Sequence, residues 1–157
     1  MICKAELWAC LRDIPGSDTF VKIDPVTKGW SDDKKYYIET IDRRRMLLRV
    51  SDIAEYDHKK SEFEKMGLVY HFGVYTSEPL CFGLCDSGKS CYSLSGWLNG
   101  NDAEKALPLM SETEQYVLGL KTGETLRKIH GLPATEGNTA DWAERYFSVM
   151  DERIMDY

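Results

Sequence analysis

Apolar and polar residues alternate in several short runs along the first hundred positions of the chain. A period of two is the pattern of a strand that buries one of its faces. Such runs occupy residues 19–23, 35–41, 46–50, 80–85 and 90–94. Charged or turn-forming residues separate the second run from the third and the fourth from the fifth, as in β-hairpins. The pattern therefore predicts a five-stranded antiparallel sheet.

A helical period replaces the strand pattern after the third run. Ser51 and Asp52 can cap a helix, and Glu55 stands three residues after Asp52, in the position of a capping box. The apolar stripe of this helix consists of Ile53, Tyr56, Phe63 and Met66. Glu62 lies beside the stripe, so we expect its carboxylate to look across towards the sheet. A shorter amphipathic helix is predicted over residues 5–13.

Residues 89–102 mark a change from strands to helices. Gly96 and Gly100 stand within this segment, and glycines at such a change are typical of a junction between structural layers. Ser111 and Glu114 then form a capping box, and the helix that follows is expected to end at His130. We therefore predict two parts, residues 1–98 with the sheet and residues 99–157 with helices.

The last predicted helix begins near residue 138 and carries a continuous apolar face. This face consists of Ala143, Phe147, Met150, Ile154 and Tyr157. No later element in the sequence covers it. An exposed apolar face of this length indicates contact with other structure, either the remainder of a longer protein or a second copy of the chain in a homodimer.

Composition narrows the class of protein. The chain has 157 residues, of which 43% are hydrophobic, and this is enough for one substantial core. With 26 acidic and 20 basic residues, its formal charge of −6 argues against a nucleic-acid partner and against an anionic membrane surface. No run reaches the ~20 apolar residues of a membrane span, and the first residues lack the pattern of a signal peptide. We therefore expect a cytoplasmic protein.

Five segments of the chain, taken in order, resemble the aminoglycoside phosphotransferase family of kinase-like enzymes. They are residues 29–36, 47–52, 61–64, 93–100 and 123–130. The resemblance runs from about Phe20 to the end of the chain. It implies an α+β, protein-kinase-like fold, with the N-terminal lobe in residues 1–98 and an incomplete, helical start of the C-terminal lobe in residues 99–157.

The resemblance also implies a nucleotide site. Gly29 and Ser31 match the loop that covers the phosphates, where glycine lets backbone N–H groups approach anionic oxygens. Arg49 stands where the family usually has a phosphate-gripping lysine, and Glu62 matches the helix carboxylate that pairs with that cation. Taken without the resemblance, the same residues would form an ordinary hairpin loop and a surface ion pair.

The purine of the nucleotide would meet the backbone of Gly96 and Leu98, and Ser95 would stand at the entrance to its pocket. ATP and GTP both remain open, each expected with Mg²⁺ as the family implies. A hydroxyl of a small molecule would be the phosphoryl acceptor, and a complete C-terminal lobe would bind that molecule.

The catalytic part of the family pattern is missing from the chain. The family carries a His-Gly-Asp loop, whereas His130 and Gly131 are followed here by Leu132. We therefore assign no catalytic residue, and the spacing of the five cysteines predicts no metal site. The expected function is nucleotide binding within a small-molecule kinase, with no transfer by this chain alone. The alternatives are a non-catalytic regulatory or dimerising module and an inert, poorly folding remnant.

Overall fold

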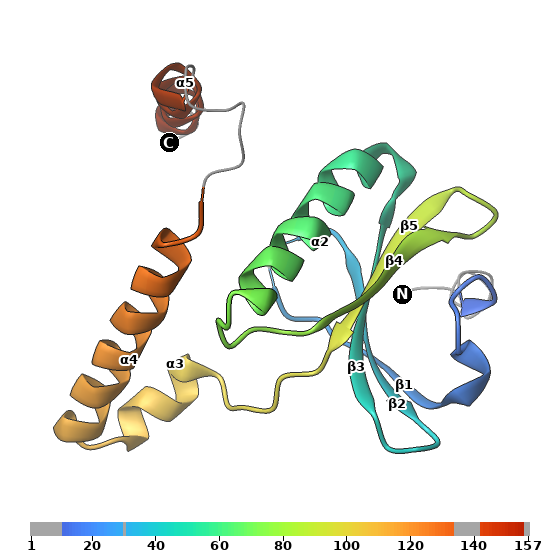
Figure 1. Ribbon diagram of the computed structural model, residues 1–157, viewed down its shortest axis with the longest axis horizontal. Coiled ribbons are helices and arrows are strands. Elements are labelled where there is room, and N and C mark those ends of the chain that lie inside the picture. Colours follow the sequence, from blue (N-terminus) through green and yellow to red (C-terminus); the bar gives the residue numbers. More distant parts are fainter. Residues whose placement is uncertain (1–10, 30, 134–141, 156–157) are drawn as a thin grey trace.

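The computed structural model describes residues 11–29, 31–133 and 142–155, and its centre is a five-stranded sheet (Figure 1). The strands are β1 (Phe20–Pro25), β2 (Lys34–Thr40), β3 (Arg45–Asp52), β4 (Pro79–Cys85) and β5 (Ser90–Gly96). They follow the order β1-β2-β3-β5-β4, and every pair of neighbours is antiparallel. The predicted five-stranded antiparallel sheet is confirmed.

One face of the sheet holds the hydrophobic core. Burial alternates along β2 and β3, and the side chains of Ile38 and Leu48 are completely buried. Leu11 and Ile14, which precede β1, belong to the same cluster of buried side chains. The period of two seen in the sequence therefore places the apolar residues of both strands on one face.

The opposite face of the sheet is only partly covered, by helix α2 (Tyr56–His71). Phe82 of β4 meets the rings of Tyr56 and Phe63, with centroid distances of 5.4 and 5.7 Å. The helix follows a short 3-10 turn, η2 (Ile53–Glu55), in which the N–H of Ala54 donates to the Asp52 carboxylate at 2.9 Å. We call the face of the sheet that α2 partly covers the α2 face. The sheet and this helix confirm the α+β class and the kinase-like arrangement.

The remaining helices lie before and after the sheet. They are η1 (Ser17–Thr19) before the sheet, and α3 (Ala103–Ala106), η3 (Leu107–Leu109), α4 (Glu112–His130) and α5 (Trp142–Met155) after it. The predicted capping box of α4 is confirmed, because Ser111 and Glu114 each accept a hydrogen bond from the other's backbone N–H. Figure 1 shows α4 standing apart from the sheet, and none of its residues is buried.

Two features complete the outline of the chain. Most of the helix predicted over residues 5–13 lies outside the described residues. Among the helices that the structure describes, none is both long and apolar enough to cross a membrane.

Candidate nucleotide site

The loop that joins β1 to β2, residues 26–33, forms the first part of the candidate site. We call it the β1–β2 loop; within it, Trp30 lies outside the described residues. Gly29 has a φ of +106°, a conformation that side chains rarely adopt. A Cβ atom built on Gly29 would lie 2.7 Å from the Nζ of Lys35. The backbone angle therefore favours glycine at this position, and a Cβ atom there would push the Lys35 ammonium aside.

Lys35 lies inside the curve of this loop. Its ammonium donates to the carbonyl oxygen of Lys28 at 3.2 Å and to that of Ser31 at 3.4 Å. Lys28 directly precedes Gly29 and Ser31 follows it by two residues, so one ammonium group contacts the loop on both sides of Gly29. Lys35 is paired with Arg49 across β2 and β3, and the two side chains therefore lie on the same face of the sheet.

Asp33 organises the cations next to the loop. Its carboxylate forms an ion pair with Arg49 at 2.7 Å and accepts a hydrogen bond from the Ser51 hydroxyl at 2.8 Å. The Nη2 atom of Arg49 also donates to the Ser31 hydroxyl at 3.2 Å. Only 6% of the Asp33 side chain is exposed, so these contacts replace the water that the carboxylate has lost.

Lys59 of α2 joins the sheet and the helix at this point. Its ammonium lies 3.2 Å from Asp33 and 3.5 Å from Glu62. Burial raises the pKa of Asp33, but the hydrogen bonds from Ser51 and Lys59 and the charge of Arg49 lower it more. The pKa of Asp33 consequently lies below its ordinary value, and the carboxylate stays ionised near neutral pH.

The ion pair expected between Arg49 and Glu62 is replaced by a different one. Both residues line one pocket of about 360 Å³, but Arg49 pairs with Asp33, whereas Glu62 pairs with Lys59 and His58. Asp33 stands two residues before Lys35, the cross-strand partner of Arg49, and is thus its diagonal neighbour on the same face. Asp33 therefore forms the ion pair with the Arg49 guanidinium. Lys59 lies between Asp33 and Glu62 and is paired with both carboxylates.

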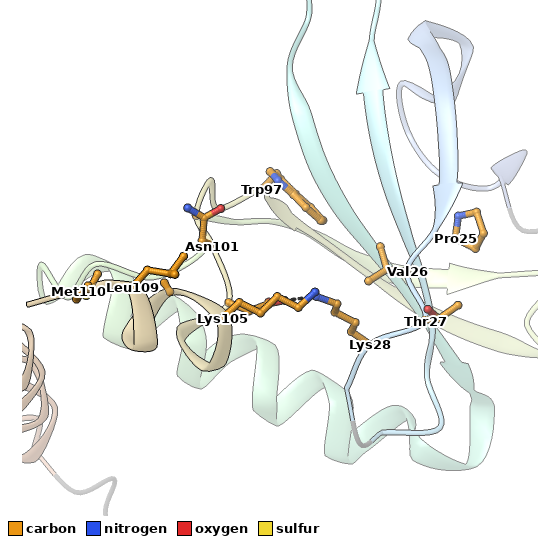
Figure 2. A pocket seen from close by; sticks show the side chains of 12 residues that line it. Pro25, Val26, Thr27, Lys28, Trp97, Asn101, Lys105, Leu109 and Met110 are labelled. Carbon is orange, nitrogen blue, oxygen red and sulfur yellow. Dashed lines mark hydrogen bonds and ion pairs between the residues drawn. The ribbon is translucent and has the colours of Figure 1, made fainter. Parts of the chain in front are cut away.

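A larger pocket of about 960 Å³ lies at the other end of the β1–β2 loop (Figure 2). We call it the hinge pocket, because the segment after β5 forms one of its sides. It is lined by Pro25, Val26, Thr27 and Lys28 on one side and by Trp97, Gly100, Asn101, Asp102, Lys105, Ala106, Leu109 and Met110 on the other. An ion pair between Lys28 and Asp102 connects the two sides.

Trp97 is held firmly in the wall of the hinge pocket. Its ring meets the ring of Tyr37 edge-on, with a centroid distance of 4.8 Å. Its backbone N–H donates to the carbonyl of Arg45 at 3.1 Å, which extends the pairing of β3 with β5. A fixed aromatic side chain in an open pocket suits contact with a flat ring.

The backbone positions expected to meet a purine are placed differently from Trp97. Gly96 ends β5, and its N–H already donates to the carbonyl of Glu78 at 2.8 Å. Leu98 follows in the hinge segment with 44% of its surface exposed. Trp97 and Gly100 line the hinge pocket, whereas Gly96 and Leu98 do not. Ser95, expected at the entrance, is buried within the sheet.

The sequence analysis missed Asp33, Lys35, Lys59 and Trp97 as members of the site. Alternation along β2 and β3 already places Lys35 on the face of Arg49, so the strand pattern contained a signal for it. The spacing of Lys59 and Glu62, three residues apart on a helix, was a weaker signal. The register that brings Asp33 to Arg49 could not be obtained from one sequence.

No metal centre is found in the described part of the chain, where no three His, Cys, Asp or Glu side chains could together hold an ion. His130 is the last residue of α4, and the N–H of Gly131 donates to the carbonyls of Arg127 and Lys128. The two residues therefore end a helix, as the sequence predicted.

Comparison with known families gives one match. The sequence model of the phosphotransferase enzyme family matches residues 22–154, which is most of the chain. A search of curated proteins finds no match. The matched region contains all of β2 to β5, α2 and the whole candidate site from Pro25 to Met110.

Proposed function

Because the chain belongs to the phosphotransferase enzyme family, we propose that it binds a purine nucleoside triphosphate, ATP or GTP, on the α2 face. The observation that carries this proposal is the β1–β2 loop. A glycine with positive φ curves around the ammonium of Lys35, at the edge of a pocket large enough for a nucleoside. Glycine-rich turns beside a fixed cation are suited to phosphate groups.

The two parts of the site fit the two parts of such a ligand. The hinge pocket has an aromatic wall in Trp97 and apolar groups in Val26 and Leu109, which suit a purine. The β1–β2 loop and Arg49 lie further along the same face, where they would meet the phosphates. Lys28 stands between the two parts, since it lines the pocket and belongs to the loop.

The reaction we propose for the complete enzyme is transfer of the γ-phosphoryl group to a hydroxyl of a small molecule. Positioning and neutralisation of charge provide most of the rate of this chemistry. Mg²⁺ would neutralise phosphate charge when bound with the nucleotide. We assign it no ligands in this chain, and we propose that the chain alone binds the nucleotide without transferring phosphate.

Titration calorimetry tests this proposal. The wild-type chain is titrated with ATP, GTP, adenosine and guanosine, each with and without Mg²⁺. We expect one triphosphate to bind more tightly than its nucleoside, and Arg49→Ala to weaken its binding by about 1–3 kcal/mol. Arg44→Ala, at the exposed tip of the β2–β3 hairpin, is the matched control and should bind like the wild type. Absence of binding by every nucleotide would overturn the proposal.

A second candidate function is dimerisation through the C-terminal helices. The observation that favours it is the exposure of Tyr146 and Phe147 on α5, at 48% and 62%, together with the absence of any buried residue in α4. The first turn of α4 is acidic and its last turn is basic, so an antiparallel pair of α4 helices from two copies would have complementary charges.

Light scattering distinguishes this candidate. A dimer would give about 36 kDa, twice the 18.0 kDa of the chain, and Phe147→Glu would return it to the mass of a monomer. Ser148→Glu places the same charge at the neighbouring exposed position and is the control. A wild-type mass of 18.0 kDa at every concentration would exclude this function.

A further inference from the structure

The cations around the β1–β2 loop differ in whether a carboxylate already neutralises them. Arg49 is paired with Asp33 at 2.7 Å, and Lys59 is paired with both Asp33 and Glu62. Two positive charges thus face two negative charges. At the other end of the loop, Lys28 is paired with Asp102.

Lys35 is the exception among these four. Both of its contacts are with backbone carbonyl oxygens, those of Lys28 and Ser31, and it forms no ion pair with any described residue. Carbonyl oxygens orient an ammonium group but do not cancel its charge. Since an ammonium has three donors and the two carbonyls take two of them, one donor is left for a ligand.

We propose that Lys35 is the principal phosphate-binding cation of this chain, in the role first expected of Arg49. The inference rests on the proposed nucleotide site and names the residue that would read its phosphates. The position fits, because Lys35 and Arg49 face each other across β2 and β3 and share Ser31 as a partner. Arg49 is then a second, weaker phosphate contact, because its charge is already shared with Asp33, and this ion pair helps to join the sheet to α2.

A glycine in the loop suits this assignment, because it leaves room for the Lys35 ammonium. The loop backbone comes so close to the ammonium that a Cβ on Gly29 would lie 2.7 Å from Nζ. The backbone of Gly29 and the Lys35 ammonium are therefore close enough to meet the same phosphate group. A charge-assisted contact of this kind is stronger than one between neutral groups.

Titration calorimetry with Lys35→Met tests the inference. We expect the affinity for the triphosphate to fall about 10- to 100-fold, while the affinity for the matching nucleoside changes less than about twofold. Lys35→Arg should recover part of the loss, because it keeps the charge. Lys34→Met removes an exposed charge one residue away and should leave both affinities unchanged. A thermal melt of each variant shows whether the fold is retained.

A second measurement does not depend on how Lys35→Met folds. Acetylation of Lys35 by a limiting acylating reagent is followed by mass spectrometry in the Lys34→Met chain, where Lys35 is the one amine of this dipeptide. We expect saturating triphosphate to slow acetylation of Lys35 at least about tenfold and the nucleoside to leave it unchanged. Lys89, exposed at the β4–β5 turn, serves as the internal reference.

The outcomes separate this inference from the proposed function. If the wild type binds triphosphate and Lys35→Met binds it equally well, the role of Lys35 is overturned and nucleotide binding stands. Equal loss of nucleoside and triphosphate affinity would also overturn it, since Lys35 would then only shape the loop. If the wild type binds no nucleotide, both proposals are wrong.

Discussion

Gly29 and Lys35 depend on each other at the scale of single residues. The backbone of Gly29 is in a region that favours glycine. A Cβ atom on Gly29 would also displace the Lys35 ammonium. Removing either residue therefore disturbs the other. The two effects, strain and crowding, can be separated experimentally because other glycines of the chain, Gly16 among them, have positive φ without crowding.

Gly29→Ala should destabilise the protein by about 1–3 kcal/mol, since it adds backbone strain and pushes the Lys35 ammonium away. It should also weaken triphosphate binding, which calorimetry and urea unfolding measure on the same samples. Gly16→Ala is the matched control. Gly16 has a φ of +79° with nothing within 4 Å of its added Cβ, so it reports strain without crowding. Equal triphosphate affinity in Gly29→Ala and the wild type would contradict the role given to this loop.

Asp33 is the most buried charge of the site, and its environment makes stability depend on pH. Its pKa in the folded protein lies below the ordinary 3.8. The ionised carboxylate therefore stabilises the fold fully above about pH 4, and this stabilisation is lost as the pH falls through the lowered pKa. The loss occurs because a protonated Asp33 no longer forms ion pairs with Arg49 and Lys59.

Asp33→Asn should accordingly lower the free energy of unfolding by about 1–3 kcal/mol at pH 7. The difference from the wild type should shrink as the pH falls from about 4 through the lowered pKa of Asp33, since the wild-type carboxylate then becomes neutral too. Urea unfolding at a series of pH values measures both effects. Asp32→Asn changes an exposed neighbour and is the control. A difference that stayed constant from pH 7 to pH 3 would show that ion pairing is not its cause.

Secondary structure elements were predicted well where one local signal decided them. Alternation in β2 and β3 gave their position to within one or two residues, and the capping box gave the first residue of α4. The partners of Arg49 and Glu62 were predicted wrongly, because they depend on strand register and on the length of an arginine side chain. Glu62 also pairs with Lys59 of its own helix. The prediction considered only partners on the sheet for this carboxylate.

Helix α4 has little tertiary packing, so the contribution of its capping box to stability can be measured almost by itself. Ser111 and Glu114 satisfy backbone donors of its first turn, and no residue of the helix is buried. Ser111→Ala should therefore destabilise this turn by about 1 kcal/mol. Hydrogen exchange of the amides in residues 112–116 should become about fivefold faster, whereas Thr113→Ala, without a capping role, should change it less. Unchanged exchange would show that other contacts hold the turn.

At the scale of the whole molecule, the buried side chains of the described residues are concentrated in one region. Nearly all buried side chains lie in the sheet and the segment before it, whereas α4 leaves Tyr116 and Leu120 exposed by 68% and 52%. The candidate nucleotide site lies between these regions, since the hinge pocket uses β1 on one side and α3 with η3 on the other. A ligand there would connect a stable part of the molecule to a weakly held one.

Hydrogen exchange across the chain tests this division. Amides of β3 and β5 should exchange at least about 100-fold more slowly than those of α4, because opening the central strands exposes the core while opening α4 exposes little more surface. Saturating triphosphate should slow exchange in residues 26–33 and 97–106, and the nucleoside should act mainly on the second segment. Protection of α4 that rises with protein concentration would instead support dimerisation through that helix. Protection of α4 equal to that of β3 at all concentrations would contradict the unequal division of stability.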